Sequence, residues 1–254
     1  MKNPGDHVID ITDKEAVIST IAQYKPKVVI NCAAYTDVDA SEQNAAHAYL
    51  VNGTAVGYIA DGCNRAGAKL VHISTDYIFA GDQARPYRED DHAGPLGVYG
   101  KSKLAGELSA HLAKDHLIVR TAWLFGRSGK NFVSTILKRT DETDVISVVD
   151  DQRGSPTYTV DLTDAIVRLL GKNASGIFHV TNSGSCTWCE YAQAVLDKAG
   201  IKDVKIMPIT TAESNRPAPR PAYSVLDCSK YQETTSHQMR SWRDALRDFL
   251  TSTR

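Results

Sequence analysis

A tyrosine and a lysine four residues apart, Tyr99 and Lys103, are the residues of this chain best placed to do chemistry. On a helix, side chains at this spacing project from one face, one turn from each other. A free phenol has a pKa near ~10, so it is a poor acid at neutral pH unless a neighbouring cation stabilises the phenolate. Lys103 is placed to supply that cation, and none of the other tyrosines has a lysine at this spacing. The pair therefore predicts proton donation to a substrate.

The segment before this pair supplies hydroxyl groups that could work with it. Lys69 to Ile73 is a short run rich in β-formers, and Ser74 and Thr75 follow it directly. Functional groups of α/β proteins gather where the strands of a parallel sheet end. We therefore expect Thr75 to meet the tyrosine there, as in the proton-donating apparatus of a nicotinamide-dependent reductase.

Length, charge and cysteine content narrow the class of protein. A chain of 254 residues can form one substantial core, or a core with a smaller lobe. The net charge of −1 gives no reason to expect a nucleic-acid or membrane-surface partner. No apolar run approaches the length that crosses a bilayer, and the first residues lack the apolar stretch of a signal peptide. Five cysteines favour a reducing compartment over a disulfide framework, so we expect a cytoplasmic protein.

Strand-like and helix-like segments alternate along the chain, which predicts a parallel sheet covered by helices. The apolar run at 28–31 is expected to be a strand buried on both faces. A capping box at 12–15 is expected to open the first helix. The Pro-rich stretch 216–221 is expected to be an extended surface segment. Further strands are expected at 8–10, 69–73, 117–120 and 176–180, and helices at 12–24, 45–66, around 99, 160–170, 187–199 and 241–250.

The glycine-rich turn of a dinucleotide site is missing from the chain. Such a site normally opens with a strand, a G-x-G-x-x-G turn and a helix whose N-terminus receives the pyrophosphate, but no such spacing occurs among the 17 glycines. We expect a Rossmann-like, doubly wound parallel α/β sheet that lacks its first β-α-β unit and carries a smaller C-terminal substrate lobe. The dinucleotide-binding domain is expected at 1–122 and about 158–182, and the lobe at about 123–157 and 183–254.

Several sequence blocks carry a resemblance to a known family. The three most distinctive are Asn31–Asp39, Ser74–Phe79 and Tyr99–Glu107. On these, and on later blocks such as Asp151–Thr157, the chain resembles the extended short-chain dehydrogenases/reductases, most closely the dTDP-4-dehydrorhamnose reductase family. Sugar-nucleotide dehydratases of the superfamily carry Asp-Glu after the threonine, whereas an Asp-Tyr pair follows it here, as in the reductases.

The resemblance implies a reaction and a role for each matching residue. The reaction is reduction of the C4 ketone of dTDP-4-dehydro-6-deoxy-L-mannose to dTDP-L-rhamnose by NADPH or NADH. Tyr99 would be the general acid, Lys103 would lower its pKa and hold the nicotinamide ribose, and Thr75 would orient the reacting oxygen. The implied cofactor-binding residues are Asp10, Ile11, Ala34, Tyr35, Thr36, Tyr99 and Lys103, and the implied substrate-binding residues are Thr75, Asp76 and Trp123. No metal is implied, the partner is the dTDP-sugar, and a homodimer is the assembly to test.

Each of these residues also has a structural interpretation. Tyr99 and Lys103 could form a pair on a surface helix, and Thr75 could be a turn hydroxyl at a strand end. Trp123 could belong to the core, and Asp10 could be an ordinary turn residue. In addition, Tyr35 is often histidine in the family.

Three other patterns are expected to be structural. Cys186 and Cys189 form a single C-x-x-C, which without a second ligand pair is a weak redox or zinc signal. His72 and His179 lie within expected strands and are interpreted as core histidines. The acidic residues of the segment 37–39 are expected to cap the next helix, with a metal role as the alternative.

Two other functions stay open at this stage. One is an epimerase or related extended dehydrogenase. The other is a non-catalytic role, because the regulatory β subunit of methionine adenosyltransferase resembles the same reductases and retains their tyrosine and lysine.

Overall fold

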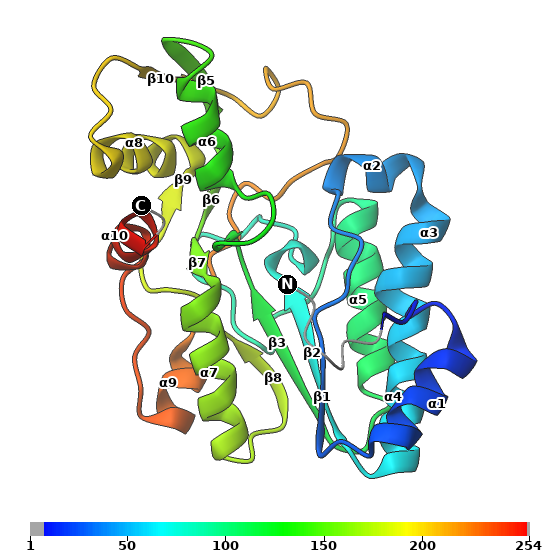
Figure 1. Ribbon diagram of the computed structural model, residues 1–254. Helices are drawn as coiled ribbons and strands as arrows, with labels where there is room; N and C mark the ends of the chain where they lie inside the picture. The colour runs from blue at the N-terminus through cyan, green and yellow to red at the C-terminus, as the bar shows by residue number, and fades with distance from the viewer. Residues whose placement is uncertain (1–7, 253–254) are drawn as a thin grey trace.

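A four-stranded parallel sheet forms the centre of the larger part of the molecule in the computed structural model, which describes residues 8–252 (Figure 1). Its strands, in spatial order, are β1 (Val28–Asn31), β2 (Lys69–Thr75), β3 (His116–Thr121) and β8 (Gly176–His179). All three strand pairs are parallel. Parallel neighbours require crossover connections, so the alternation of strands and helices in the sequence correctly predicted the sheet.

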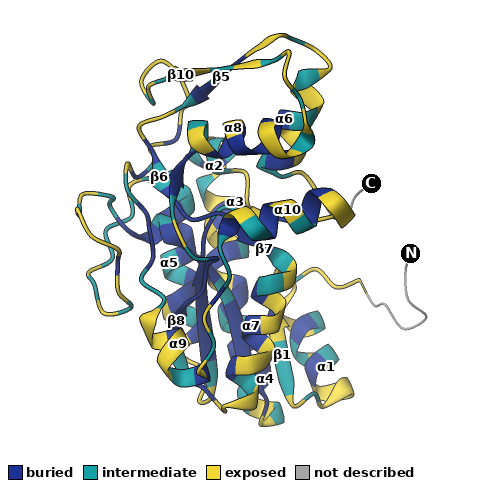
Figure 2. Cartoon of the chain, turned by 90° about the vertical axis from the view of Figure 1, so that its left-hand side faces the viewer, coloured by how far each residue is buried: buried dark blue, intermediate teal, exposed yellow. Residues whose placement is uncertain are grey.

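Helices cover both faces of this sheet, and the strands are buried between them (Figures 1 and 2). One face carries α1 (Lys14–Tyr24), α4 (Ala55–Ala66) and α5 (Val98–Ala110), whose apolar residues share a core with Leu70 and Ile118. The other face carries α7 (Thr159–Gly171) and α9 (Ser229–Thr235), which pack on Val71, Leu117 and Val119. The predicted doubly wound α/β architecture is confirmed.

A smaller lobe with its own core lies beyond the carboxyl ends of the strands. Its apolar residues come from α6, β5, α8 and α10, with Phe125, Tyr158 and Tyr191 among the buried aromatics. The elements of the lobe are β4 (Leu124–Phe125), α6 (Phe132–Thr140), β5 (Val145–Val149), β6 (Arg153–Gly154), β7 (Thr157–Tyr158), β9 (Cys186–Thr187), α8 (Trp188–Ala199), β10 (Lys205–Ile209) and α10 (Trp242–Ser252). The domain limits drawn from the sequence stay a prediction, and Tyr231 of α9 packs with the sheet although its segment was assigned to the lobe.

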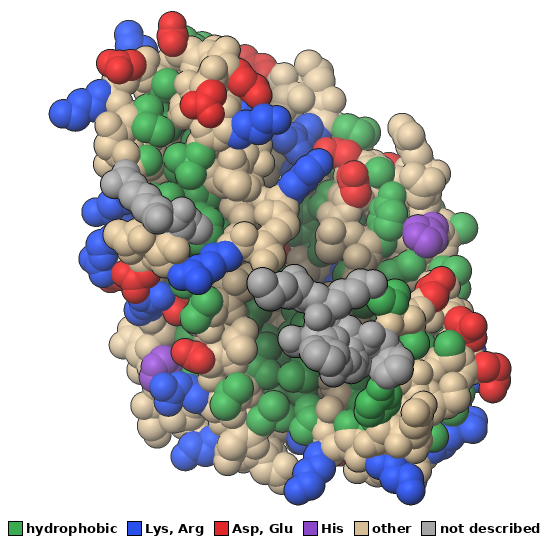
Figure 3. All heavy atoms as spheres, in the orientation of Figure 1, with side chains coloured by type: hydrophobic (Ala, Val, Ile, Leu, Met, Phe, Trp, Pro, Cys, Tyr) green, Lys and Arg blue, Asp and Glu red, His purple; other side chains and the backbone are tan. Residues whose placement is uncertain are grey.

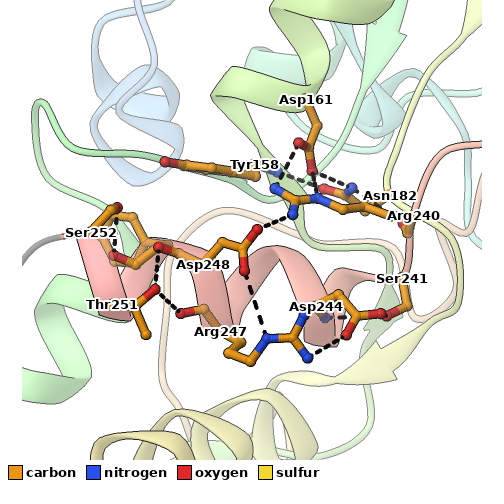
Figure 4. A network of polar contacts seen from close by, with 11 residues as sticks. Tyr158, Asp161, Asn182, Arg240, Ser241, Asp244, Arg247, Asp248, Thr251 and Ser252 are labelled. Carbon is orange, nitrogen blue, oxygen red and sulfur yellow. Dashed lines mark hydrogen bonds and ion pairs between the residues drawn. The ribbon is translucent and has the colours of Figure 1, made fainter.

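A partly exposed ion-pair network joins the last helix of the lobe to the first turn of α7 (Figure 4). The Arg240 guanidinium donates two hydrogen bonds to Asp161, at 2.8 and 2.9 Å, and forms an ion pair with Asp248 of α10. The Asn182 amide donates to the same Asp161 carboxylate at 2.7 Å. The network links three segments that are far apart in the sequence.

The beginning of the described chain differs from the prediction. Residues 8–10 do not form a strand, and within residues 8–252 no strand lies beside them; Val8 is 83% exposed. The Asp10 carboxylate instead accepts the amide and hydroxyl of Thr12, at 2.9 and 2.8 Å. Because Thr12 is engaged in this turn, Asp13 caps α1 by accepting the amide of Ala16.

Two further expectations need correction. Ile30 is 49% exposed, because β1 is the edge strand of the sheet in the described part of the chain and its outer side lacks a neighbour. The expected helix at 45–66 consists of α3 (Ala45–Tyr49), a π-helical segment η1 (Leu50–Thr54) and α4, and is preceded by the short helix α2 (Val38–Gln43). The π-helical segment carries Asn52, whose side chain bonds to the backbone of Tyr35 after β1, so a tertiary contact accompanies the irregular turn.

Candidate active site

The helix that carries Tyr99 and Lys103 packs unusually close to its neighbours. A Cβ atom on Gly100 would lie 2.3 Å from the carbonyl oxygen of Tyr77, and one on Gly106 would lie 2.1 Å from that of Asn52. Both distances are far below van der Waals contact, so only glycine allows this approach. The two glycines of α5 therefore set how deeply Tyr99 and Lys103 reach over the end of β2.

Thr75, Tyr99 and Lys103 meet at the carboxyl end of β2. The hydroxyl groups of Thr75 and Tyr99 are hydrogen-bonded. The ring of Tyr77, which follows in the 3₁₀ turn η2 (Asp76–Ile78), packs edge-on against Tyr99 with centroids 5.6 Å apart. One turn below, Lys103 Nζ donates to the carbonyl oxygen of Ile73 at 2.6 Å. The structure thus brings together the three residues that the sequence selected as catalytic.

The electrostatics of the pair differ from the expectation. Burial raises the pKa of Tyr99 to about 12, and the Asp76 charge adds to this, while the bond to Thr75 acts in the opposite direction. Burial lowers the pKa of Lys103 to about 8, opposed by the charges of Glu107 and Cys32. The expected lowering of the phenol pKa by Lys103 is absent, because the ammonium group is turned toward the Ile73 carbonyl. Tyr99 therefore keeps its proton at neutral pH, as a general acid must.

Asp76 lies beside Thr75 but is almost fully buried, with 2% of its surface exposed. Ser224 donates to one carboxylate oxygen at 2.5 Å and Thr75 to the other at 3.1 Å. Burial raises the pKa of Asp76 to about 6, and these two bonds oppose the rise. Asp76 thus fixes the Thr75 hydroxyl, and its contact with a substrate stays a prediction. The sequence did not single out Ser224, which the chain brings to the site from 148 positions away.

The loop after β1 lies along the same edge of the sheet and carries the predicted cofactor residues Ala34, Tyr35 and Thr36. The Asn52 side chain accepts the Tyr35 amide at 2.7 Å and donates to its carbonyl oxygen at 3.0 Å. The side-chain NH₂ group of Asn52 also donates to Ser102 Oγ on α5, at 2.9 Å. Asn52 therefore holds this loop in register with the helix that carries Lys103, and the sequence analysis did not identify it.

Asp10 and Ile11, which are also predicted to contact the cofactor, lie just before α1. Hydrogen bonds from Thr12 lower the pKa of Asp10, and the nearby charge of His47 adds to this. The His47 ring in turn contacts Tyr35 edge-on, with centroids 5.3 Å apart. Asp10 therefore lies near the loop after β1, while its carboxylate is used in a local turn, as the structural interpretation supposed.

A cleft of about 540 Å³ separates this edge of the sheet from the lobe. It is lined by Thr36, Asp37, Val38, Asp39, Tyr77, Phe132, Thr135, Ile136, Arg139, Ser147, Val148, Val149, Gln152, Trp188, Ile209, Ser214, Arg216 and Arg220. In Figure 3, basic and acidic side chains adjoin one another in the upper middle of the molecule, between the lobe and the part that carries the sheet. The cleft is large enough for a drug-sized ligand and offers both aromatic and cationic walls.

Trp123 contributes to an aromatic wall rather than standing alone. Its ring stacks on Trp188 with centroids 3.5 Å apart and an angle of 8°, and Phe132 packs against Trp188 in turn. A Cβ atom on Gly154 would lie 2.5 Å from the Trp123 ring, so a glycine is required behind it. Trp188 faces the cleft, and the sequence analysis noted it only as part of the C-x-x-C segment; the contact of Trp123 with a sugar stays a prediction.

The segment 216–221 is more than the extended surface stretch that its prolines predicted. Asp39 of α2 accepts hydrogen bonds from the side chains of Arg220 (2.9 Å) and Arg216 (3.4 Å), and from the backbone amide of Ala218 (3.2 Å). Ala218 is buried and the Arg220 side chain is only 9% exposed. The reason is the partly exposed Asp39 carboxylate on α2, which accepts these three hydrogen bonds and holds the segment on the wall of the cleft.

Asp37 and the two strand histidines occupy the structural positions expected of them. Asp37 caps α2 by accepting the Ala40 amide at 2.9 Å, and His72 and His179 are fully buried. Cys186 and Cys189 are free thiols. Over residues 8–252 no group of three or more His, Cys, Asp or Glu side chains could hold a metal ion, and no helix is long and apolar enough to cross a membrane.

A tyrosine and a lysine on one helix face, with a threonine at the strand end of a doubly wound parallel sheet, define a reductase of the short-chain dehydrogenase type. The family model described as the RmlD substrate binding domain matches residues 2–254, so the chain belongs to this family.

Related proteins match nearly the whole length of this chain. The spore coat polysaccharide biosynthesis protein SpsK of Bacillus subtilis is 44% identical over 96% of this chain and 85% of its own length. A dTDP-4-dehydrorhamnose reductase of Streptomyces griseus is 43% identical over 94% of this chain and 81% of its own. The crystal structure of dTDP-4-dehydrorhamnose reductase from Bacillus anthracis in complex with NADP is 40% identical, with a TM-score of 0.94 over 96% of this chain and 87% of that chain.

Proposed function

We propose that this protein reduces the C4 ketone of dTDP-4-dehydro-6-deoxy-L-mannose to give dTDP-L-rhamnose, with NADPH or NADH as the reductant. The observation that carries the proposal is the convergence of Thr75, Tyr99 and Lys103 at the carboxyl end of β2, beside the cleft. Membership of a family whose relatives include dTDP-4-dehydrorhamnose reductases supplies the substrate class. We also propose that the protein acts in the cytoplasm, and a homodimer is the assembly to test.

Proton donation is the task of Tyr99. Reduction of a ketone builds negative charge on its oxygen, and a phenol whose pKa lies near 12 is fully protonated when that charge develops. Thr75 already bonds to this phenol and is itself fixed by Asp76, so its hydroxyl can orient the reacting oxygen without further ordering. The hydrogen bonds of Thr75 to Tyr99 and Asp76 are strengthened by their burial, because the local dielectric constant is low there.

The residues around Lys103 fit a nicotinamide cofactor. When bound, this cofactor supplies the hydride. Lys103 has three donors, and one of them is used by Ile73, which leaves the others for ribose hydroxyls. The loop that follows β1 passes beside it and carries two small residues, Ala33 and Ala34, so the backbone is open to close approach. Tyr35 and Thr36 continue along the same edge toward the cleft.

The cleft fits the rest of a nucleoside-diphosphate sugar. Arg139 and Arg216 are exposed side chains on its wall, and guanidinium groups bind diphosphates well. Trp188 and Phe132 offer flat apolar faces for a base or a sugar. We assign the diphosphate to the arginines and the flat ring surfaces to the aromatic wall, with Trp123 supporting Trp188 from behind.

The decisive experiment replaces the proton donor. Tyr99→Phe should lower kcat by about 10²–10⁴-fold in an assay of NADPH oxidation with the dTDP-4-keto sugar, because general acid catalysis contributes about that factor. Tyr58→Phe is the matched control, since Tyr58 lies on α4 against Lys14 and away from the cleft. A loss of less than about threefold in Tyr99→Phe would refute the assignment. If the native protein and Tyr58→Phe are both folded and neither turns over this substrate, the substrate class is refuted.

A further inference from the structure

The last three residues of β2 each bond to a different residue of α5, and the α5 residues are spaced four apart. Thr75 bonds to Tyr99, and the Ile73 carbonyl oxygen accepts a hydrogen bond from Lys103, as described above. The third bond joins Ser74 Oγ to Glu107 Oε1 at 2.5 Å. A carboxylate therefore occupies the third position of the helix face that carries the acid and the cation.

Glu107 is a buried and fully paired charge. It is 2% exposed, and Arg120 of β3, itself 4% exposed, binds both of its oxygens, at 2.9 Å through Nε and at 2.8 Å through Nη2. A charge this deep is costly unless it is paired and hydrogen-bonded, and here both conditions are met. The geometry also fixes the helix, because Ser74 and Arg120 hold Glu107 from two adjacent strands.

Glu107 is also the negative charge that acts on Lys103. The other titratable groups that face Lys103 are Cys32 after β1, His72 of β2 and Tyr99 on its own helix. Burial raises the pKa of Cys32 and of Tyr99 and lowers that of His72 well below its usual range, so all three are neutral near pH 7. Beyond the helix, Glu107 faces Arg120 and, at the end of α5, His111.

We propose that Glu107 is a positioning residue, which fixes the register of α5 along β2 and keeps the Lys103 ammonium group charged at the active site. The inference rests on the proposed function of Lys103 in holding the nicotinamide ribose. The inference explains why Lys103, which must be charged to hold the ribose, keeps its proton. Burial lowers the pKa of Lys103, and the carboxylate one turn away opposes that effect.

The test is the alkaline limb of the pH profile. In the native protein, kcat/KM and the affinity for NADPH should fall as pH rises through about 8, where Lys103 loses its proton. Glu107→Gln keeps the shape of the side chain but removes its charge. An effective dielectric constant of ~20 and a separation of ~6 Å imply that the limb should move to lower pH by about one unit or more.

Two further variants separate charge from packing. Glu107→Gln leaves Arg120 unpaired and could fail to fold, so the double variant Glu107→Gln/Arg120→Met removes both charges of the buried pair. Its limb should move in the same direction. Ser74→Ala removes a hydrogen bond to Glu107 and keeps the charge, so it should lower the melting temperature and leave the limb in place.

Calorimetric titration of NADPH into each variant at several pH values gives a readout that does not depend on turnover. A limb that stays at its native pH in both Glu107 variants would overturn the proposal. An equal shift in Ser74→Ala would also overturn it, since packing would then explain the effect. Native protein that neither turns over nor binds NADPH would refute the proposed function, and this inference with it; native activity with an unmoved limb would refute the inference alone.

Discussion

Lys103 should make the fold less stable while it serves the reaction, and Lys103→Met tests this directly. Burial lowers the pKa of the amine from its usual 10.5 to about 8. At about 1.4 kcal/mol per pKa unit, this difference corresponds to roughly 3 kcal/mol of destabilisation whenever the amine is charged. Methionine loses the hydrogen bond to Ile73, worth about 1 kcal/mol, and fills a similar volume. We therefore expect Lys103→Met to be more stable than the native protein by about 2 kcal/mol at pH 7.

The sign of the pH dependence follows from the same shift. The folded-state pKa lies below the unfolded one, so the destabilisation is fully present below about pH 8 and disappears as pH approaches 10.5. Urea unfolding at several pH values should show that the advantage of Lys103→Met shrinks over this window. Lys101→Met, at an exposed position of the same helix, is the control and should change neither stability nor activity.

Activity should respond in the opposite direction. Loss of a charge-assisted hydrogen bond to a ribose hydroxyl costs about 1.5–3 kcal/mol, or roughly 10–150-fold in kcat/KM. A variant that is more stable and almost inactive would show that the buried ammonium is retained for function. A variant that is less stable than the native protein at pH 7 would refute the argument, because the amine would then be a net structural contact.

Three other outcomes are expected. Thr75→Val should lower kcat by about 10-fold or more in the NADPH oxidation assay, because it removes the hydroxyl that bonds to Tyr99, and it should also lower the melting temperature, because the buried Asp76 loses a donor. Gly106→Ala should destabilise the protein by about 1–3 kcal/mol in urea unfolding, because its Cβ would lie 2.1 Å from the Asn52 carbonyl oxygen. Arg240→Met should cost about 1–3 kcal/mol by the same measurement, since it leaves the Asp161 carboxylate without its bidentate partner.

The sheet and the catalytic residues were predictable because each depends on local sequence. The runs at 69–73 and 117–120 are rich in β-forming apolar residues, and parallel strands with helical crossovers follow from their alternation with helix-like segments. The i, i+4 spacing of Tyr99 and Lys103 is likewise a local property of one helix. Where a neighbour decides the outcome, prediction failed: 8–10 is not a strand, and Ile30 is exposed, because a strand's burial depends on what lies beside it.

The supporting residues of the site could not be found from spacing. Ser224 reaches Asp76 across 148 positions, and Asn52 lies in a π-helical segment whose irregularity has no periodic signature in the sequence. Trp188 lines the cleft because the packing of the lobe stacks its ring on Trp123. Such contacts are made by tertiary packing, so they become visible only with the fold.

The electrostatics of the pair show most clearly why residue type and spacing are not enough. From the sequence, a lysine one turn from a tyrosine should lower the phenol's pKa; in the structure, burial dominates and raises it to about 12. The cation is held one turn below by the Ile73 carbonyl oxygen of β2, and the charge of Glu107 acts on it from the next turn of α5. Proton donation by Tyr99 and the positive charge of Lys103 are therefore two separate tasks in the structure, although the sequence motif suggested that the second serves the first. Desolvation of the Tyr99 hydroxyl keeps its proton in place, and in the role we propose for it the buried Glu107 carboxylate keeps Lys103 charged. A reductase needs both groups protonated at the same pH, and a helix that carries acid, cation and anion at successive turns meets that need with one register against β2.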